Sequence, residues 1–265
     1  MSDEILTRVD NGIAVITLNR PARFNALTRE MLSDLGAILT GYAESPDIGC
    51  VVLTGAGRAF CSGGDVQVQA QVAAQGSTQS PEERADVLRR TMKASELLHD
   101  MPKPTIAMVN GVAAGAGMSL ALACDMRVVA ASARMTTAFA KVGLSGDYGG
   151  TYFLTQLVGP AMARELYLLA EVLDSARLKE LGLASRVVPD EALEAETMAL
   201  ARRFADGPRL AYRYIKRNLN IAEKGVLSDT LDAEALGLMR TRMTEDHREA
   251  ARAFVEKRAP VFRGR

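Results

Sequence analysis

Short apolar segments alternate with amphipathic helical segments in the first half of the chain, and this alternation constrains the fold most. Strand-like runs rich in β-branched and apolar residues lie at residues 13–18, 50–54, 105–109 and 126–130. After Thr28, a residue type that caps helices, apolar side chains recur at helical spacing over 31–42. Strands separated by helices pair in parallel and are covered on both faces, so the pattern predicts an α/β fold with a mostly parallel sheet.

The second half of the chain has a different character. Residues 82–98 are predicted to form one helix, and from about Asp190 the sequence turns to charged helical segments. We therefore expect a core over residues 1–200 and a helical C-terminal region over residues 201–265.

Composition excludes several classes of function. Lys and Arg together number 32, as do Asp and Glu, so nothing attracts the chain to nucleic acid or to an anionic membrane surface. Its three cysteines form no CxxC pair, and with no signal-peptide core at the N-terminus we expect a cytoplasmic protein. Only two histidines are present, which disfavours both a metal centre and a Ser-His-Asp triad.

Two glycine-rich turns are the strongest candidates for chemistry. Residues 57–65 follow one predicted strand and residues 110–117 follow another, at the strand ends where open α/β sheets bind ligands. Glycine lets backbone N–H groups approach a ligand closely, and the second turn also opens a helix, whose N-terminus favours negative charge. Two such donors from separate loops can hold an oxyanion. The alternatives are tight turns without function or a phosphate site, although neither turn matches GxGxxG or GxxxxGK[ST].

The sequence resembles the crotonase, or enoyl-CoA hydratase/isomerase, superfamily. The motifs that carry the resemblance run in order and at family spacing through residues 19–27, 58–66, 103–125, 143–151 and 256–262. The resemblance implies an α/β fold made of a spiral of ββα units, with a C-terminal α-helical trimerisation region. It further implies a coenzyme A thioester as substrate, no tightly bound cofactor or metal, and a homotrimer or a hexamer built as a dimer of trimers.

The resemblance also assigns site residues. The backbone N–H groups of Ser62 and Ala116 would form the oxyanion hole, while Arg23 would lie near the nucleotide part of coenzyme A. Lys257 and Phe262 would reach the coenzyme site from the tail of this or a neighbouring subunit. The full set of expected substrate-binding residues is Ala22, Arg23, Ser62, Gly63, Gly64, Asp65, Val66, Ala116, Phe139, Tyr148, Lys257 and Phe262.

The acid-base residues set this chain apart from the family's hydratases. Ser119 and Phe139 stand where hydratases carry their two glutamates, and neither can serve as a base alone. Asp147 stands where they have glycine, as it does in ring-1,2-epoxyphenylacetyl-CoA isomerases and Δ3,Δ2-enoyl-CoA isomerases, which this pattern resembles most. Its apolar neighbours are expected to raise its pKa, so Asp147 is the candidate proton shuttle of an isomerase.

The sequence is also compatible with other roles for Asp147 and with other functions of the chain. Asp147 can instead cap a helix that begins near Tyr148. Hydration would require Tyr148 or Ser119 to help hold a water, and halide displacement resembles aryl-CoA dehalogenases, whose tryptophan and histidine partners are missing here. Outside enzymes, the loss of both glutamates is compatible with a non-catalytic coenzyme A-binding or scaffold protein.

Overall fold

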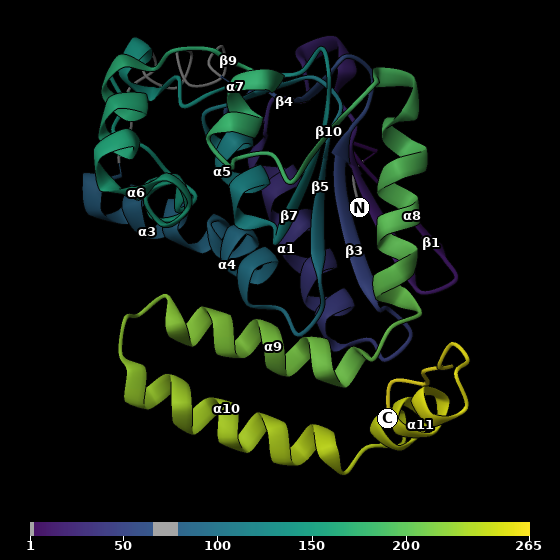
Figure 1. The fold of residues 1–265 in the computed structure, drawn as a ribbon. Helices are drawn as coiled ribbons and strands as arrows, with labels where there is room; N and C mark the ends of the chain where they lie inside the picture. The colour runs from purple at the N-terminus through teal and green to yellow at the C-terminus, as the bar shows by residue number, and fades with distance from the viewer. Residues whose placement is uncertain (1–2, 66–78) are drawn as a thin grey trace.

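Two sheets organise the fold, and the computed structural model describes residues 3–65 and 79–265 (Figure 1). The larger sheet has the order β1-β2-β3-β5-β7-β10, with only β1 and β2 antiparallel. Its strands are β1 (Ile5–Asp10), β2 (Ile13–Leu18), β3 (Cys50–Gly55), β5 (Thr105–Val109), β7 (Met126–Ala130) and β10 (Arg186–Val188). The smaller sheet has the order β4-β6-β8-β9. Its strands are β4 (Ala59–Cys61), β6 (Val112–Ala114), β8 (Arg134–Thr136) and β9 (Leu173–Asp174).

A ββα unit repeats along the chain. Each central strand of the larger sheet is followed by a short strand of the smaller sheet and then by helix, as in β5, β6 and α5. Because β3, β5 and β7 are parallel neighbours, the turns at their carboxyl ends stack beside one another. The expected spiral of ββα units is confirmed, and it brings the two glycine-rich turns together.

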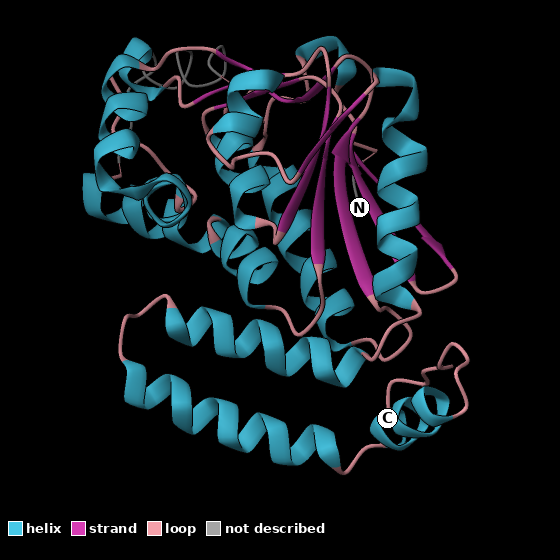
Figure 2. Cartoon of the chain, viewed as in Figure 1, coloured by secondary structure: helices cyan, strands magenta, loops and turns pink. Residues whose placement is uncertain are grey.

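Helices cover both faces of the larger sheet (Figure 2). Helix α8 packs on β2, β3, β5 and β7 from one side, while α1, α4 and α5 lie on the other. The helices are α1 (Arg29–Glu44), α3 (Pro81–Thr91), α4 (Lys93–Asp100), α5 (Ala116–Ala123), α6 (Gly150–Leu169), α7 (Ser175–Glu180), α8 (Leu193–Ala205), α9 (Arg209–Ala222), α10 (Leu227–Arg242) and α11 (Glu245–Val255). Short 3₁₀ turns are η1 (Pro21–Arg23), η2 (Phe139–Val142) and η3 (Asp190–Ala192).

The predicted strands over 13–18, 105–109 and 126–130 are confirmed to the residue. The single helix predicted over residues 82–98 is wrong, because α3 ends at Thr91 and α4 begins at Lys93. A capping box between Ser80 and Glu83 fixes the start of α3. Within the described residues, no helix is both long and apolar enough to span a membrane.

The C-terminal helices leave the sheet. Helices α9 and α10 pack against each other below it, and α11 follows near the C-terminus (Figure 1). The expected division after residue 200 falls inside α8, which still covers the sheet, so the helices that stand apart begin with α9 at Arg209.

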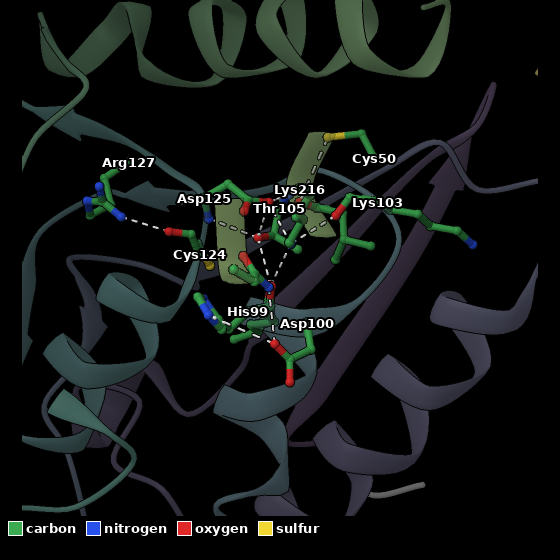
Figure 3. A network of polar contacts seen from close by, with 12 residues as sticks. Cys50, His99, Asp100, Lys103, Thr105, Cys124, Asp125, Arg127 and Lys216 are labelled. Atoms are coloured by element: carbon green, nitrogen blue, oxygen red, sulfur yellow. Dashed lines mark hydrogen bonds and ion pairs between the residues drawn. The ribbon is translucent and has the colours of Figure 1, made fainter. Parts of the chain in front are cut away.

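One partly buried ion pair fastens α9 to the core (Figure 3). The Nζ of Lys216 lies 2.7 Å from Oδ2 of Asp125 and donates to the carbonyls of Leu98 and Lys103 at 3.0 and 3.1 Å. The same carboxylate oxygen accepts from the backbone N–H and the hydroxyl of Thr105. The network lies at the amino ends of β5 and β7, opposite the glycine-rich turns.

Candidate active site

The two glycine-rich turns touch each other through their backbones. Strand β4, which lies within the first turn, runs parallel to β6, which lies within the second. A Cβ on Gly63, whose φ is +92°, would lie 2.9 Å from the carbonyl oxygen of Ala114. A Cβ on Gly117 would lie 2.2 Å from the carbonyl oxygen of Cys61. Only glycine fits at these positions, so the glycine residues serve the close approach of the two turns.

The second turn offers a free donor at the start of α5. Ala116 is the first residue of that helix, where an N–H has no partner within the helix. The residue before it, Gly115, has a φ of 54° and provides no side chain to cap the helix. No hydrogen bond between described residues uses the Ala116 N–H. This N–H therefore matches the expected donor.

The first turn corrects the expectation for Ser62. Its N–H donates to the carbonyl of Phe24 at 2.9 Å and is not available to a ligand. Further along, Leu27 donates to the Gly63 carbonyl at 2.8 Å and accepts from the Asp65 N–H at 3.4 Å.

This pairing determines which way Gly64 points. Successive peptide groups of a strand point to opposite sides. Leu27 forms its bridge to Gly64 by bonding to the Gly63 carbonyl and the Asp65 N–H, on either side of Gly64. The N–H of Gly64 therefore points away from Leu27, to the side where Gly63 approaches the Ala116 N–H. The geometry thus offers Gly64 and Ala116, rather than Ser62 and Ala116, as converging donors.

Asp147 lies in the loop between η2 and α6 and is mostly buried. Its Oδ1 is inaccessible to solvent and has no hydrogen-bond partner among the described residues. Burial raises the pKa of this carboxyl from 3.8 to about 6. Burial above all, with the Asp147 carboxylate adding to it, also raises the pKa of the Cys61 thiol to about 12. Asp147 therefore lies near the end of β4, beside the first turn.

Asp147 does not cap a helix, so that alternative is wrong. Helix α6 begins at Gly150, and its N-cap is Gly149, which has no side chain to accept a hydrogen bond. Only the backbone carbonyl of Asp147 takes part, accepting from the Gly150 N–H at 3.1 Å. A buried polar atom without a partner costs free energy, and such atoms are characteristic of functional positions.

The residues at the hydratase glutamate positions have other roles. Ser119 is buried in α5 and donates its hydroxyl to the Gly115 carbonyl at 3.2 Å. Phe139 stacks on Tyr167, with ring centroids 6.0 Å apart and planes within 2°. Tyr167 was not predicted from the sequence. It lies in the second half of α6, beyond a kink at Gly159 and Pro160 that interrupts the helical spacing.

Tyr148 is a packing residue with an occupied hydroxyl. Its side chain is buried, and its hydroxyl lies 2.9 Å from Oγ1 of Thr91. Thr91 donates its own hydrogen to the Leu88 carbonyl at 2.7 Å, so Tyr148 is the donor in this pair. The hydroxyl is therefore directed to α3 rather than left for a substrate.

The other residues predicted to bind substrate lie in different parts of the fold. Ala22 and Arg23 are exposed in η1. Asp65 forms an ion pair with Arg20 at 3.1 Å, and Val66 lies outside the described residues. Lys257 and Phe262 follow α11 at the C-terminal end of the molecule, and within one chain they do not join the two turns (Figure 1).

Phe262 lies by other C-terminal residues. It lines a cavity of about 430 Å³ together with Leu238 of α10 and Ala250 of α11. Elsewhere, residues 3–65 and 79–265 contain no cluster of His, Cys, Asp and Glu able to hold a metal ion.

Known proteins resemble this chain over its whole length. The enoyl-CoA hydratase/isomerase family model matches residues 8–265. The 1,2-epoxyphenylacetyl-CoA isomerase of Escherichia coli K12 is 38% identical over 265 residues, covering all of both chains. The crotonyl-CoA hydratase of Syntrophomonas wolfei is 31% identical, covering 98% of both chains.

Solved structures of similar proteins have the same fold. The enoyl-CoA hydratase of Bacillus anthracis superposes with a TM-score of 0.91 at 30% identity, covering 99% of this chain and all of the other. Fold, motifs and sequence likeness thus lead to one conclusion: this chain belongs to the enoyl-CoA hydratase/isomerase family.

Proposed function

We propose that the protein is an enoyl-CoA isomerase, which moves a double bond along an acyl chain by shuttling a proton through Asp147. The observation that carries the proposal is the buried, unpartnered Oδ1 of Asp147, whose carboxylate acts electrostatically on Cys61 in the first glycine-rich turn. A carboxyl whose pKa is about 6 is partly ionised near neutral pH and can both accept and return a proton.

The backbone donors of Gly64 and Ala116 supply the other half of the chemistry. When Asp147 removes a proton from the acyl chain, negative charge develops on the thioester oxygen. Two N–H groups fixed by the contact between the turns would stabilise this enolate, and removing one such donor typically costs about 3–4 kcal/mol. Protonated Asp147 then returns the proton to a different carbon, which completes the isomerisation.

A single carboxylate favours isomerisation over hydration. Hydration needs one group to activate a water and another to protonate the substrate. The hydroxyl of Ser119 is donated to the Gly115 carbonyl, Phe139 has no acid-base group, and the Tyr148 hydroxyl is directed to Thr91. Hydration remains the second candidate because the crotonyl-CoA hydratase of S. wolfei is among the similar proteins.

The experiment is incubation with Δ3-enoyl-CoA and Δ2-enoyl-CoA thioesters in D₂O, followed by mass spectrometry. Isomerisation shifts the double bond without adding water, whereas hydration adds one water to the product. A coenzyme A thioester of a halogenated aromatic acid tests displacement, which would exchange the halide for a hydroxyl group.

Substitution of the base separates an enzyme from a scaffold. Asp147→Asn keeps the size of the side chain but removes the base, so turnover should fall by at least about a hundredfold. Asp10→Asn, at the exposed end of β1, is the matched control and should retain full turnover. Thioester binding without turnover by the wild-type protein would favour the scaffold interpretation.

The coenzyme and the assembly complete the proposal. We infer that Arg23 and Ala22, exposed beside the first turn, lie near the nucleotide part of coenzyme A. Lys257 and Phe262 are proposed to reach the coenzyme site from a neighbouring subunit of a trimer or hexamer, since within their own chain they remain with the C-terminal helices.

A further inference from the structure

Tyr167 contacts both halves of the candidate active site. Its hydroxyl and the side chain of Ser119 in α5 both lie against the same position, the Cα of Gly150. Its ring lies against the loop that carries Asp147, since a Cβ on Gly146 would be 3.2 Å from Cε1 of Tyr167.

The contacts of Tyr167 lead toward the second turn. Ser119 donates its only hydroxyl hydrogen to the carbonyl of Gly115, so toward the nearby Tyr167 hydroxyl it can act only as an acceptor. Gly115 is the N-cap of α5 and directly precedes the Ala116 donor. The contacts from Tyr167 through Ser119 therefore end on the peptide unit that sets the direction of the Ala116 N–H.

The surroundings hold Tyr167 in this position. A Cβ on Gly150 would stand 2.3 Å from Oγ of Ser119 and 2.4 Å from the hydroxyl of Tyr167, so only glycine leaves room for the pair. On the other side, the ring of Tyr167 stacks on Phe139. The edge of the Phe139 ring faces Gly115, where a Cβ would lie 3.7 Å from it.

We propose that Tyr167 is a positioning residue, which aligns the Ala116 N–H with the Asp147 carboxyl by holding Ser119 with its hydroxyl and the Gly146 loop with its ring. This inference rests on the proposed function, because it assigns to Tyr167 the alignment of that oxyanion donor and that base. Alignment matters because small displacements of catalytic groups reduce rates strongly.

The first test separates the hydroxyl from the ring. Tyr167→Phe keeps the stacking on Phe139 and removes the hydroxyl beside Ser119, so kcat for isomerisation should fall about tenfold while KM changes little. Ser119→Ala removes the other end of this contact and also the hydrogen bond to Gly115, so kcat should fall at least as much. Because Tyr167 is proposed to act through Ser119, the double variant should be no slower than Ser119→Ala alone.

The second test reads the oxyanion donors without turnover. The carbonyl stretch of a bound, saturated acyl-CoA is measured by isotope-edited infrared difference spectroscopy. The wild-type protein should shift this band to lower wavenumber, and Tyr167→Phe should lose a clear part of the shift. Tyr212→Phe, in α9, is the matched control and should keep both kcat and the shift.

The outcomes distinguish the two proposals. Asp147→Asn should abolish turnover but leave the carbonyl shift, whereas Tyr167→Phe should weaken both. Wild-type kcat and a full shift in Tyr167→Phe, or multiplicative losses in the double variant, would overturn the role of Tyr167 alone. A wild-type protein that binds the thioester without any shift would overturn the proposed function and this role together.

Discussion

The buried carboxyl of Asp147 makes the reaction rate depend on pH in a defined direction. A base acts only when it is deprotonated, and burial raises the pKa of this carboxyl to about 6. The ratio kcat/KM should therefore rise with pH through about 6 and level off above pH 7. Initial rates with a Δ3-enoyl-CoA between pH 4.5 and 8 measure this. A rate that is already constant at pH 5 would argue against Asp147 as the base.

The same carboxyl should reduce stability above its pKa. A pKa raised in the folded state means that the folded protein binds more protons than the unfolded chain between pH 4 and 6. Stability is therefore lost as pH rises through that window. Asp147→Asn removes this cost, so its free energy of unfolding should exceed the wild-type value by up to about 3 kcal/mol at pH 8. Urea unfolding at pH 8 and near pH 4 measures the difference, which should vanish at the lower pH.

Single residues also mark where sequence-based prediction succeeds and where it fails. A raised pKa was predicted for Asp147 because its neighbours are apolar, and burial among them does raise it. The donor in the first turn was misassigned to Ser62, because the availability of an N–H depends on pairing with Phe24 and Leu27, which are far away in sequence. Tyr167 was missed because its position beside Ser119 and Gly146 arises only when α6, with its kink at Gly159, packs on α5.

Among the secondary-structure elements, α9 depends most on one side chain. Lys216→Met would leave the Asp125 carboxylate without its cation and the Leu98 and Lys103 carbonyls without a donor. Removing one partner of a buried ion pair costs several kcal/mol. The cost should be smaller here, because Asp125 is partly exposed and keeps its hydrogen bond from Thr105. We therefore expect a loss of about 2–4 kcal/mol in the free energy of unfolding.

Urea unfolding and hydrogen exchange along α9 measure this effect. Arg213→Met, on the exposed side of the same helix, is the matched control and should change stability by less than about 0.5 kcal/mol. Because the network lies at the amino ends of β5 and β7, kcat of the folded variant should stay close to wild type. An unchanged stability of Lys216→Met would show that α9 is held by its apolar contacts alone.

The elements themselves were predicted well where local pattern and burial agree. Strands β5 and β7 are short and apolar, and both are buried in the sheet as expected. The break between α3 and α4 was missed because Met92 at the junction carries no breaking signal such as glycine or proline.

At the scale of the whole molecule, the C-terminal helices expose more large apolar side chains than a free surface usually does. Exposed fractions reach 62% for Leu238, 80% for Met243 and 85% for Phe254. Large exposed apolar side chains that are this numerous on neighbouring helices are typical of an association site. We therefore expect the chain to associate through these helices, as a trimer or as a hexamer built from two trimers.

Charged substitutions on this surface should dissociate the assembly. Placing a carboxylate in an apolar interface without a partner is strongly unfavourable, so Leu238→Asp and Phe254→Asp should each lower the molar mass measured by light scattering after size-exclusion chromatography. Leu168→Asp is the matched control, because Leu168 is 75% exposed but lies on α6. If Lys257 and Phe262 complete a neighbouring coenzyme site, dissociation should also raise KM for the thioester. A monomeric wild-type protein with full activity would refute this assembly.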